Sequence, residues 1–355
     1  MGREAALTKD LELEFTLPAR YIKMKFRKNV SLAKYSTFKI GGKAKYFFIS
    51  STEKDLIKAV KTAKELNPVR DKSLNGVKMP FFILGGGSNL LVSDKGYDGA
   101  VIKMKNEKLK IKNYNSKFKI FCESGTPLAK LVNASVEKGL TGLEWAAGIP
   151  GTVGGAVRGN AGAFGNSISD IVKTVKCLEA ESLNIKVLRN KDCKFEYRDS
   201  IFKKNKNLII LSAEMKLKKV YELRSSSPTS SIERVRKNIK KNLEQRKKTQ
   251  PLNFPSAGSV FRNVKYEIKN EKLLEEFPKL KEFNKKGIIP TGYLIEGCGL
   301  KGKKIGKAKI SEKHSNFIVN LGGAKADDVK KLINLAKKQV KKKFKIILEE
   351  EIQYL

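Results

Sequence analysis

Two glycine-rich segments give the first chemical signal in this chain. Residues 142–165 (GLEWAAGIPGTVGGAVRGNAGAFG) place glycines at short intervals among apolar residues typical of a packed interior, and residues 83–91 (ILGGGSNLL) follow an apolar run. Glycines at this density indicate positive φ angles or a close approach of the backbone to another group. Main-chain N–H groups freed in this way form nests that bind anions such as pyrophosphate. We therefore expect main-chain N–H groups of these segments to bind a large cofactor that carries two negative charges.

Neither segment matches a familiar nucleotide-binding motif. Residues 85–90 (GGGSNL) lack the last glycine of G-x-G-x-x-G, and no G-K-[ST] follows, which disfavours Rossmann and Walker A sites. Each turn alone is equally well explained as a tight structural turn. The two together favour a ligand, because polar side chains accompany them. These side chains are Ser88, Asn89, Thr152 and Asn160.

Length and composition predict a globular protein of two or three domains. The chain has 355 residues, of which 40% are hydrophobic, so it can bury ample core. No run of ~18 apolar residues occurs, so we expect no membrane-spanning helix, and the first residues lack the pattern of a signal peptide. The cysteines are widely spaced, which predicts reduced thiols in the cytoplasm and neither disulfides nor a metal site. They are Cys122, Cys177, Cys193 and Cys298.

The formal net charge of +38 invites a nucleic-acid-binding interpretation. Lysine is spread along the whole chain, however, and on the helix expected at residues 327–342 the lysines occupy the face opposite an apolar stripe. No zinc finger, RRM core or aromatic-interleaved basic stripe accompanies the charge. A solvated surface explains it better, so we expect no nucleic-acid partner, while the positive field would attract small anionic substrates.

Hydrophobic periodicity outlines the elements that must position these groups. Apolar residues at helical spacing predict helices at residues 51–66, 127–138, 232–245 and 327–342. Strands are expected at residues 79–84, 101–104, 118–123, 172–178, 185–188, 208–217 and 344–355. The serine-rich stretch at residues 225–231 suits a domain boundary.

A series of ordered blocks then identifies a family. The chain resembles the UDP-N-acetylenolpyruvoylglucosamine reductases, flavoenzymes of peptidoglycan synthesis, from about residue 35 to residue 351. Besides the two glycine segments, the blocks are YSTFKIGG (35–42), EYRDSIFK (196–203), PSAGSVFRN (255–263), GYLIEGCGLKG (292–302) and SEKHSNFIVN (311–320). Any one block would be weak, whereas their shared order is specific.

The resemblance implies an α+β fold with a vanillyl-alcohol-oxidase-type FAD-binding domain of two subdomains, followed by an α+β substrate-binding domain. It places an N-terminal extension at residues 1–29, FAD subdomains at 30–104 and 105–224, the UDP-sugar domain at 225–343 and a terminal strand with the catalytic glutamate at 344–355. NADPH is the implied co-substrate. The implied substrate is UDP-N-acetylenolpyruvoylglucosamine, whose enolpyruvyl ether receives the hydride of the reduced flavin, and a monomer is expected.

The resemblance also assigns catalytic roles. Arg198 matches the cation that stabilises charge developing on the enolpyruvyl group, a role that hydride addition requires on electrostatic grounds. Glu351 matches a carboxylic acid near the enolate, and as a donor it would need a pKa raised by desolvation. Glu349 and Glu350 adjoin it, which leaves the register open. Ser259 matches the proton donor.

Binding residues follow from the same match. Cofactor binding is assigned to Gly85, Gly86, Gly87, Ser88, Asn89, Leu90, Gly148, Gly151, Thr152, Gly154, Gly155, Asn160, Gly162 and Tyr197. Substrate binding is assigned to Asn263 and to the basic run 246–248, of which we select Lys248 for the diphosphate. The only histidine, His314, is far in sequence from both glycine turns, so we expect FAD to be held without a covalent bond.

The sequence departs from the family pattern at two places, and two alternative functions stay open. One branch of the family inserts a tyrosine-bearing loop that closes over the substrate, and residues 202–225 lack it, so the chain looks like the loop-lacking type. Arg158 stands where many members have an apolar residue, as a lineage variation or as an extra anion contact. The rivals are an oxygen-using flavin oxidase of the same fold and a basic nucleic-acid-binding protein, whose affinity would fall steeply with salt.

Overall fold

A computed structural model describes residues 26–65, 79–114, 117–219 and 228–355 of the chain. Most of the predicted N-terminal extension, residues 1–25, lies outside this description. The strand β1 (Arg27–Ser31) already occupies the end of that extension, where it pairs antiparallel with β2. The folded part of the chain therefore begins earlier than the predicted boundary at residue 30.

The N-terminal part is a four-stranded sheet covered by one helix. Its strand order is β1-β2-β5-β3, with β2, β5 and β3 parallel. The strands after β1 are β2 (Lys43–Ser50), β3 (Phe81–Leu84) and β5 (Tyr97–Met104), and the helix is α1 (Glu53–Glu65). Helix α1 forms because its apolar residues recur on one face, where Leu56 and Val60 are fully buried. Two acidic residues in its first turn also favour the helix dipole.

The second part is an antiparallel sheet in the order β12-β11-β13-β7-β6. Its strands are β6 (Leu109–Tyr114), β7 (Lys117–Glu123), β11 (Val172–Glu179), β12 (Ile185–Arg189) and β13 (Leu208–Lys219). Helices α2 (Leu128–Glu137) and α3 (Val153–Arg158) and the short strands β8 (Leu140–Thr141), β9 (Gly162–Ala163) and β10 (Asn166–Ser167) complete it. Ile209 and Leu211 of β13 pack with Leu56 and Ile102, which joins this sheet to the first one.

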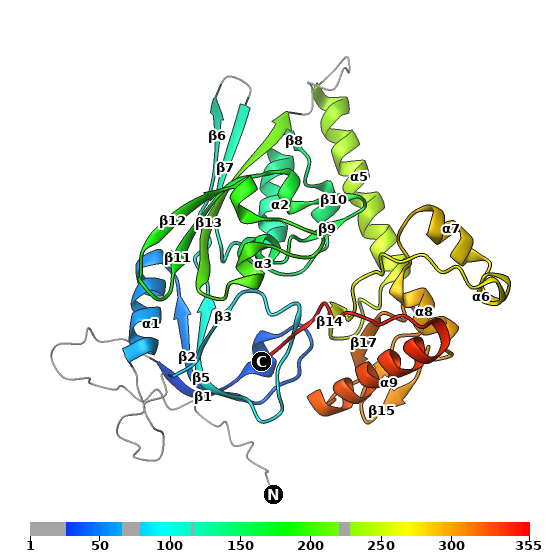
Figure 1. Cartoon of the computed structure of the whole chain (residues 1–355). Helices are drawn as coiled ribbons and strands as arrows, with labels where there is room; N and C mark the ends of the chain where they lie inside the picture. The colour runs from blue at the N-terminus through cyan, green and yellow to red at the C-terminus, as the bar shows by residue number, and fades with distance from the viewer. Residues whose placement is uncertain (1–25, 66–78, 115–116, 220–227) are drawn as a thin grey trace, which may run out of the picture.

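The third part begins after the long helix α5 (Pro228–Thr249), which runs from the second part toward it (Figure 1). A four-stranded antiparallel sheet has the order β14-β17-β16-β15. Its strands are β14 (Ser256–Ser259), β15 (Lys304–Ile305), β16 (Ala308–Ile310) and β17 (Phe317–Asn320). Its helices are α6 (Glu271–Glu276), α7 (Lys279–Lys285), α8 (Thr291–Gly297) and α9 (Ala326–Phe344). Phe38 and Ile40 of the first part are buried in the same core.

The C-terminal segment corrects one prediction. Phe344 is the last residue of α9, and only β18 (Gln353–Tyr354) forms a strand, parallel to β4 (Leu90–Leu91). The apolar alternation of Ile346 and Leu348 imitates a strand, but both side chains pack in the third core without a regular ladder. The segment returns from α9 to the middle of the molecule, as the red trace in Figure 1 shows.

The mixed helix and sheet content agrees with the predicted α+β class. The predicted boundary at residues 104 and 105 falls between β5 and β6. The boundary at residues 224 and 225 lies outside the described residues, as does part of the serine-rich stretch. Within the described ranges, no helix combines the length and the apolar character needed to cross a bilayer.

Asn320, at the end of β17, ties the third part to the first. Its side-chain amide donates to the carbonyl of Phe38 at 3.0 Å and its oxygen accepts from the N–H groups of Gly322 and Ala324. The side chain is 3% exposed. We expect Asn320→Ala to lower the free energy of unfolding by about 1–3 kcal/mol, because buried polar groups lose their partner. Urea denaturation would measure it, and the exposed Asn113→Ala serves as control; equal stability of the two variants would contradict the assignment.

Candidate active site

The two glycine turns that the sequence singled out lie against each other. A Cβ atom on Gly86 would stand 2.5 Å from the Cα atom of Gly151, and one on Gly151 would stand 2.8 Å from the Ser88 hydroxyl oxygen. Gly87 has a φ of +63°, and a Cβ there would lie 2.1 Å from the carbonyl oxygen of Tyr35. The turns therefore approach backbone to backbone, which only glycine allows.

Polar groups surround the second turn. The Thr152 hydroxyl caps α3 by accepting from the N–H of Gly155 at 3.4 Å. The N–H of Gly154 donates to the carbonyl of Ser124 at 2.8 Å. The buried hydroxyls of Ser124 and Thr126 find no hydrogen-bond partner among the residues that the structure describes. A glycine cradle beside orphaned hydroxyls fits a phosphate-bearing cofactor, which would supply the missing acceptors.

Other predicted cofactor residues serve packing. A Cβ on Gly148 would lie 2.9 Å from Leu243 of α5, and one on Gly162 would lie 2.6 Å from the carbonyl oxygen of Asn166. A Cβ on Gly85 would meet the Thr152 hydroxyl at 2.8 Å. These glycines permit close contacts within the protein, and their contact with the cofactor stays a prediction.

The first glycine turn also holds the C-terminal segment. The Asn89 side chain donates to the carbonyl of Glu351 at 2.9 Å, and the N–H of Gln353 donates to the carbonyl of Asn89 at 3.0 Å. Leu90 is buried in β4, beside Gln353. Asn89 and Leu90, for which cofactor binding stays a prediction, also hold the segment that bears Glu351.

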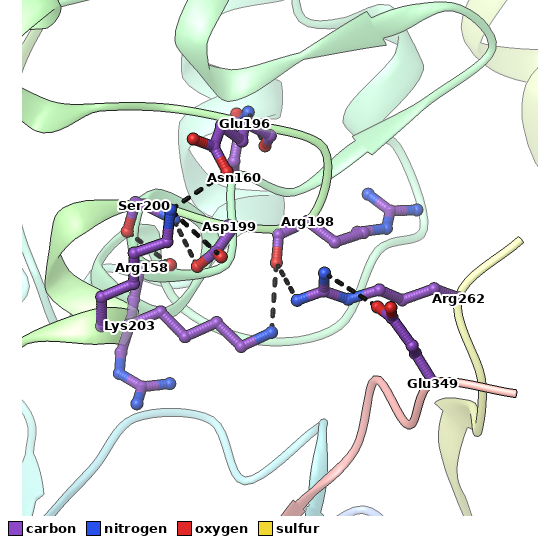
Figure 2. A network of polar contacts seen from close by, with 10 residues as sticks. Arg158, Asn160, Glu196, Arg198, Asp199, Ser200, Lys203, Arg262 and Glu349 are labelled. Carbon is purple, nitrogen blue, oxygen red and sulfur yellow. Dashed lines mark hydrogen bonds and ion pairs between the residues drawn. The ribbon is translucent and has the colours of Figure 1, made fainter. Parts of the chain in front are cut away.

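A tight turn presents Arg198. Glu196 and Asp199 exchange both backbone hydrogen bonds, so Tyr197 and Arg198 form a two-residue loop. Arg198 has a φ of +57°, which glycine or asparagine ordinarily adopts at the second position of such a turn. The Asn160 amide group donates to the carbonyl of Glu196 at 2.8 Å and so anchors the loop to the second glycine segment (Figure 2).

Arg198 and Glu351 form an ion pair although 153 positions separate them in sequence (351 minus 198). The Nε atom of Arg198 lies 3.0 Å from the Oε1 atom of Glu351, and the two side chains are 26% and 19% exposed. Burial raises the pKa of the Glu351 carboxyl, and the positive charges of Arg198, Lys203 and Arg262 oppose that shift. Desolvation is the larger effect, so the pKa of the carboxyl stays above its ordinary value despite these cations.

The structure decides the register among three adjacent glutamates. Glu350 is bonded to Lys337 and to the hydroxyl of Tyr354. Glu349 is 74% exposed and lies 3.6 Å from Arg262. Only Glu351 of the three is paired with Arg198. Alternation along an extended backbone turns Glu350 away from its two neighbours, and the ion pair with Arg198 then distinguishes Glu351 from Glu349.

Ser259 belongs to the same cluster through the backbone. The N–H of Glu351 donates to the carbonyl of Val260 at 2.8 Å, and the N–H of Arg262 donates to the carbonyl of Glu349 at 2.9 Å. Ser259 immediately precedes these contacts at the end of β14 and pairs with Phe317. The segments bearing Arg198, Ser259 and Glu351 thus meet, although they come from different parts of the fold.

The residues predicted to bind the substrate do not form one cluster in the structure. The Asn263 side-chain oxygen accepts from the N–H of Thr291 at 3.2 Å. Lys248 is exposed in the last turn of α5. Arg246 of the same basic run points inward, where it donates to the carbonyl of Trp145 and lies over the ring of Phe164. Sequence reasoning selected Lys248, whereas the structure makes Arg246 the buried cation of this run.

Several residues near Arg198 escaped sequence reasoning. Lys203 and Arg262 both donate to the Arg198 carbonyl, and both stood at the ends of recognised blocks. Ser124 and Thr126 lie outside every block, and only their unpaired burial reveals them. His314 lies against Gly292 at the start of α8, in the third part of the chain.

Comparisons with known proteins identify the family. Residues 250–355 match the model of the UDP-N-acetylenolpyruvoylglucosamine reductase C-terminal domain, and residues 44–183 match an FAD-binding domain. The UDP-N-acetylenolpyruvoylglucosamine reductase of Caldicellulosiruptor bescii is 39% identical over 97% of this chain and 95% of its own length. The chain belongs to this reductase family. The reductase of Caldanaerobacter subterraneus is 37% identical over 92% of both chains.

A solved structure of the same family agrees with the fold. The crystal structure of the reductase from Thermus caldophilus matches with a TM-score of 0.68 and 29% identity, over 93% of this chain and 99% of that one. The predicted fold class and the prediction of an FAD enzyme are thereby confirmed. The individual roles of Arg198, Ser259 and Glu351 stay predictions.

Gly86→Ala tests the contact between the turns. The new Cβ would stand 2.5 Å from the Gly151 Cα atom, and overpacking of this kind costs about 1–3 kcal/mol. We expect the Kd for FAD to rise roughly tenfold or more, as measured by flavin fluorescence during titration of apoprotein. Gly159→Ala is the matched control, because its Cβ would reach only an ordinary contact of 3.5 Å. Equal FAD affinity in both variants would show that the two glycine turns do not form the FAD-binding site.

The buried Glu351 carboxyl predicts a pH dependence of stability. Its pKa is raised above the ordinary value of 4.5, so the folded protein keeps a proton that the unfolded chain releases. The resulting stability is present below the unfolded pKa and is lost as pH rises through the folded pKa. Relative to Glu351→Gln, the wild-type free energy of unfolding should therefore fall as pH increases upward from 4.5. Urea titrations over about pH 4 to 8 measure the wild-type free energy of unfolding minus that of the variant, and a value that rises with pH contradicts the assignment.

Proposed function

We propose that this protein uses NADPH to reduce the enolpyruvyl ether of UDP-N-acetylenolpyruvoylglucosamine, giving UDP-N-acetylmuramate for peptidoglycan synthesis. The observation that carries the proposal is the Arg198–Glu351 pair, held beside two apposed glycine turns. Family membership supports it independently, because the C-terminal reductase domain and the FAD-binding domain occur on one chain.

Arg198, Glu351 and Ser259 supply the groups that the reduction requires: a cation, a hydrogen-bond donor and a proton donor. The glycine turns would hold FAD, which when reduced by NADPH would supply a hydride for the terminal methylene carbon of the enolpyruvyl group. Electron density then builds up on the adjacent carbon and its carboxylate, where the Arg198 guanidinium stabilises it. Glu351 is proposed to donate a hydrogen bond to the same region when it is protonated, and burial, which raises the pKa of its carboxyl, favours that form over the ion pair with Arg198. The Ser259 hydroxyl gives its proton to the adjacent carbon, which completes the saturated lactyl ether.

Binding roles follow from position. Asn263, at the end of the SVFRN block, faces the start of α8 and is proposed to contact the UDP portion. Arg246 is proposed as the main cation for the diphosphate, with Lys248 as a secondary contact, because Arg246 is 8% exposed and its Nε atom has no partner among the described residues. Tyr197, 38% exposed beside Arg198, is proposed to line the entrance near the flavin.

The wider setting is also a proposal. FAD is held without a covalent bond, since His314 lies against Gly292 of α8, in the third part of the chain. The protein acts as a monomer in the cytoplasm, where its buried cysteines stay reduced. Its predicted domains are FAD subdomains at residues 30–104 and 105–224 and a substrate domain at residues 225–343. Nucleic acid and membranes are not its partners.

Anaerobic half-reactions test this function. With FAD and NADPH, the wild-type flavin should bleach, and the enolpyruvyl sugar should restore its absorbance with one NADPH consumed per sugar. Arg198→Ala and Glu351→Gln should keep bleaching by NADPH but slow the recovery by the sugar by about 100-fold or more, because their roles concern the enolate alone.

The controls separate the alternatives. Asn113→Ala, far from the site in β6, should behave as wild type in both half-reactions. Wild-type recovery by oxygen but not by the sugar would indicate an oxidase. A colourless protein that binds nucleic acid in a salt-dependent manner would refute the reductase altogether. Loss of flavin from either active-site variant would reassign that residue to cofactor binding.

A further inference from the structure

The peptide carbonyl of Arg198 receives two cationic donors from different parts of the chain. The Nζ atom of Lys203, on α4 (Ile201–Lys204), donates to it at 3.1 Å, and the Nη2 atom of Arg262 donates at 3.4 Å. Figure 2 shows both side chains converging on this oxygen, and the ion pair of Arg262 with Glu349 behind them. Charged donors make stronger hydrogen bonds than neutral ones, so this carbonyl is firmly oriented.

The carbonyl that they hold belongs to a strained residue. A non-glycine residue with positive φ costs on the order of 1–3 kcal/mol and persists only where the surroundings over-determine it. The N–H of Asp199, which lies in the same peptide unit as the Arg198 carbonyl, donates to the carbonyl of Glu196 at 3.1 Å, so the turn already fixes one side of this peptide. Lys203 and Arg262 hold the opposite, carbonyl side of the same peptide, so bonds on both of its sides fix the backbone from which the Arg198 side chain projects.

The placement of Lys203 is itself costly. Burial lowers the pKa of its ammonium group, and the nearby positive charges of Arg262 and Arg158 lower it further, against the opposing charges of Asp199 and Glu351. Its neighbour Lys204 has the ordinary arrangement, exposed and paired with Glu196 at 3.0 Å. A lysine kept half-buried among like charges is unlike a solvated surface lysine and calls for a specific role.

We propose that Lys203 is a positioning residue for the reduction, which holds the Arg198 peptide so that the guanidinium lies against Glu351 and the enolate. This assignment rests on the proposed function. Lys203 acts through Arg198, whose carbonyl it holds. Arg262, the second donor, shares the task, so the loss of Lys203 alone is partial.

The test measures both anaerobic half-reactions in Lys203→Met, Lys203→Arg and the matched control Lys204→Met. Lys203→Met should slow flavin reoxidation by the enolpyruvyl sugar about tenfold, because a misplacement of a catalytic group by less than 1 Å has effects of this size. Flavin reduction by NADPH and flavin content should stay within about twofold of wild type. Lys203→Arg should restore most of the rate, and Lys204→Met should match wild type.

A double-variant cycle separates positioning from simple stabilisation. In an Arg198→Ala background the carbonyl remains but the guanidinium is gone, so Lys203→Met should add less than about a twofold further loss. The same tenfold loss in that background, or unchanged reoxidation in Lys203→Met, would overturn the proposal. If Lys203→Met does not fold, Lys203→Gln, which keeps a neutral donor, is compared with Lys203→Arg on the same criteria. A wild-type protein that the sugar cannot reoxidise would overturn the proposed function instead, and this assignment with it.

Discussion

The close approach of Gly86 to Gly151 is the constraint on which the rest of the site depends. Any side chain at Gly86 would separate the first glycine turn from the second by several tenths of an ångström or more. Because the first turn also bonds the C-terminal segment through Asn89, and the second bonds the Arg198 turn through Asn160, their separation would move both catalytic partners. The contact between the two glycine turns therefore also fixes the relative positions of Arg198 and Glu351.

Electrostatics at the site balance desolvation against charge. Burial raises the pKa of the Glu351 carboxyl, and the positive charges of Arg198, Lys203 and Arg262 oppose that shift. An excess of cations over carboxylates within the site is unfavourable by itself and becomes favourable when an anionic substrate enters. The high net charge of the chain therefore has two components, a solvated lysine surface and a small buried group with chemical consequences.

Much of the fold was predictable because its signals are local. The apolar stripe of α1, with Leu56 and Val60, and the lysine-rich face of α9 follow helical periodicity, and both helices form close to the predicted residues. The prediction of a strand over residues 344–355 was wrong for most of the segment. The alternating side chains of Ile346 and Leu348 are buried in the core, but their backbone forms no hydrogen-bonded strand pair. Local patterns report which side chains are buried but do not report which backbone groups will pair.

The sequence by itself determined the family, the cofactor and the cradle, since ordered motifs and glycine density are properties of the linear chain. Only the tertiary structure decided which glutamate pairs with Arg198. It also decided that Arg246 points inward while Lys248 does not, and that Lys203 donates a hydrogen bond to the Arg198 carbonyl. The reason is physical. These relations depend on backbone hydrogen bonds between segments far apart in sequence, and on a positive φ at Arg198 that no residue preference would suggest.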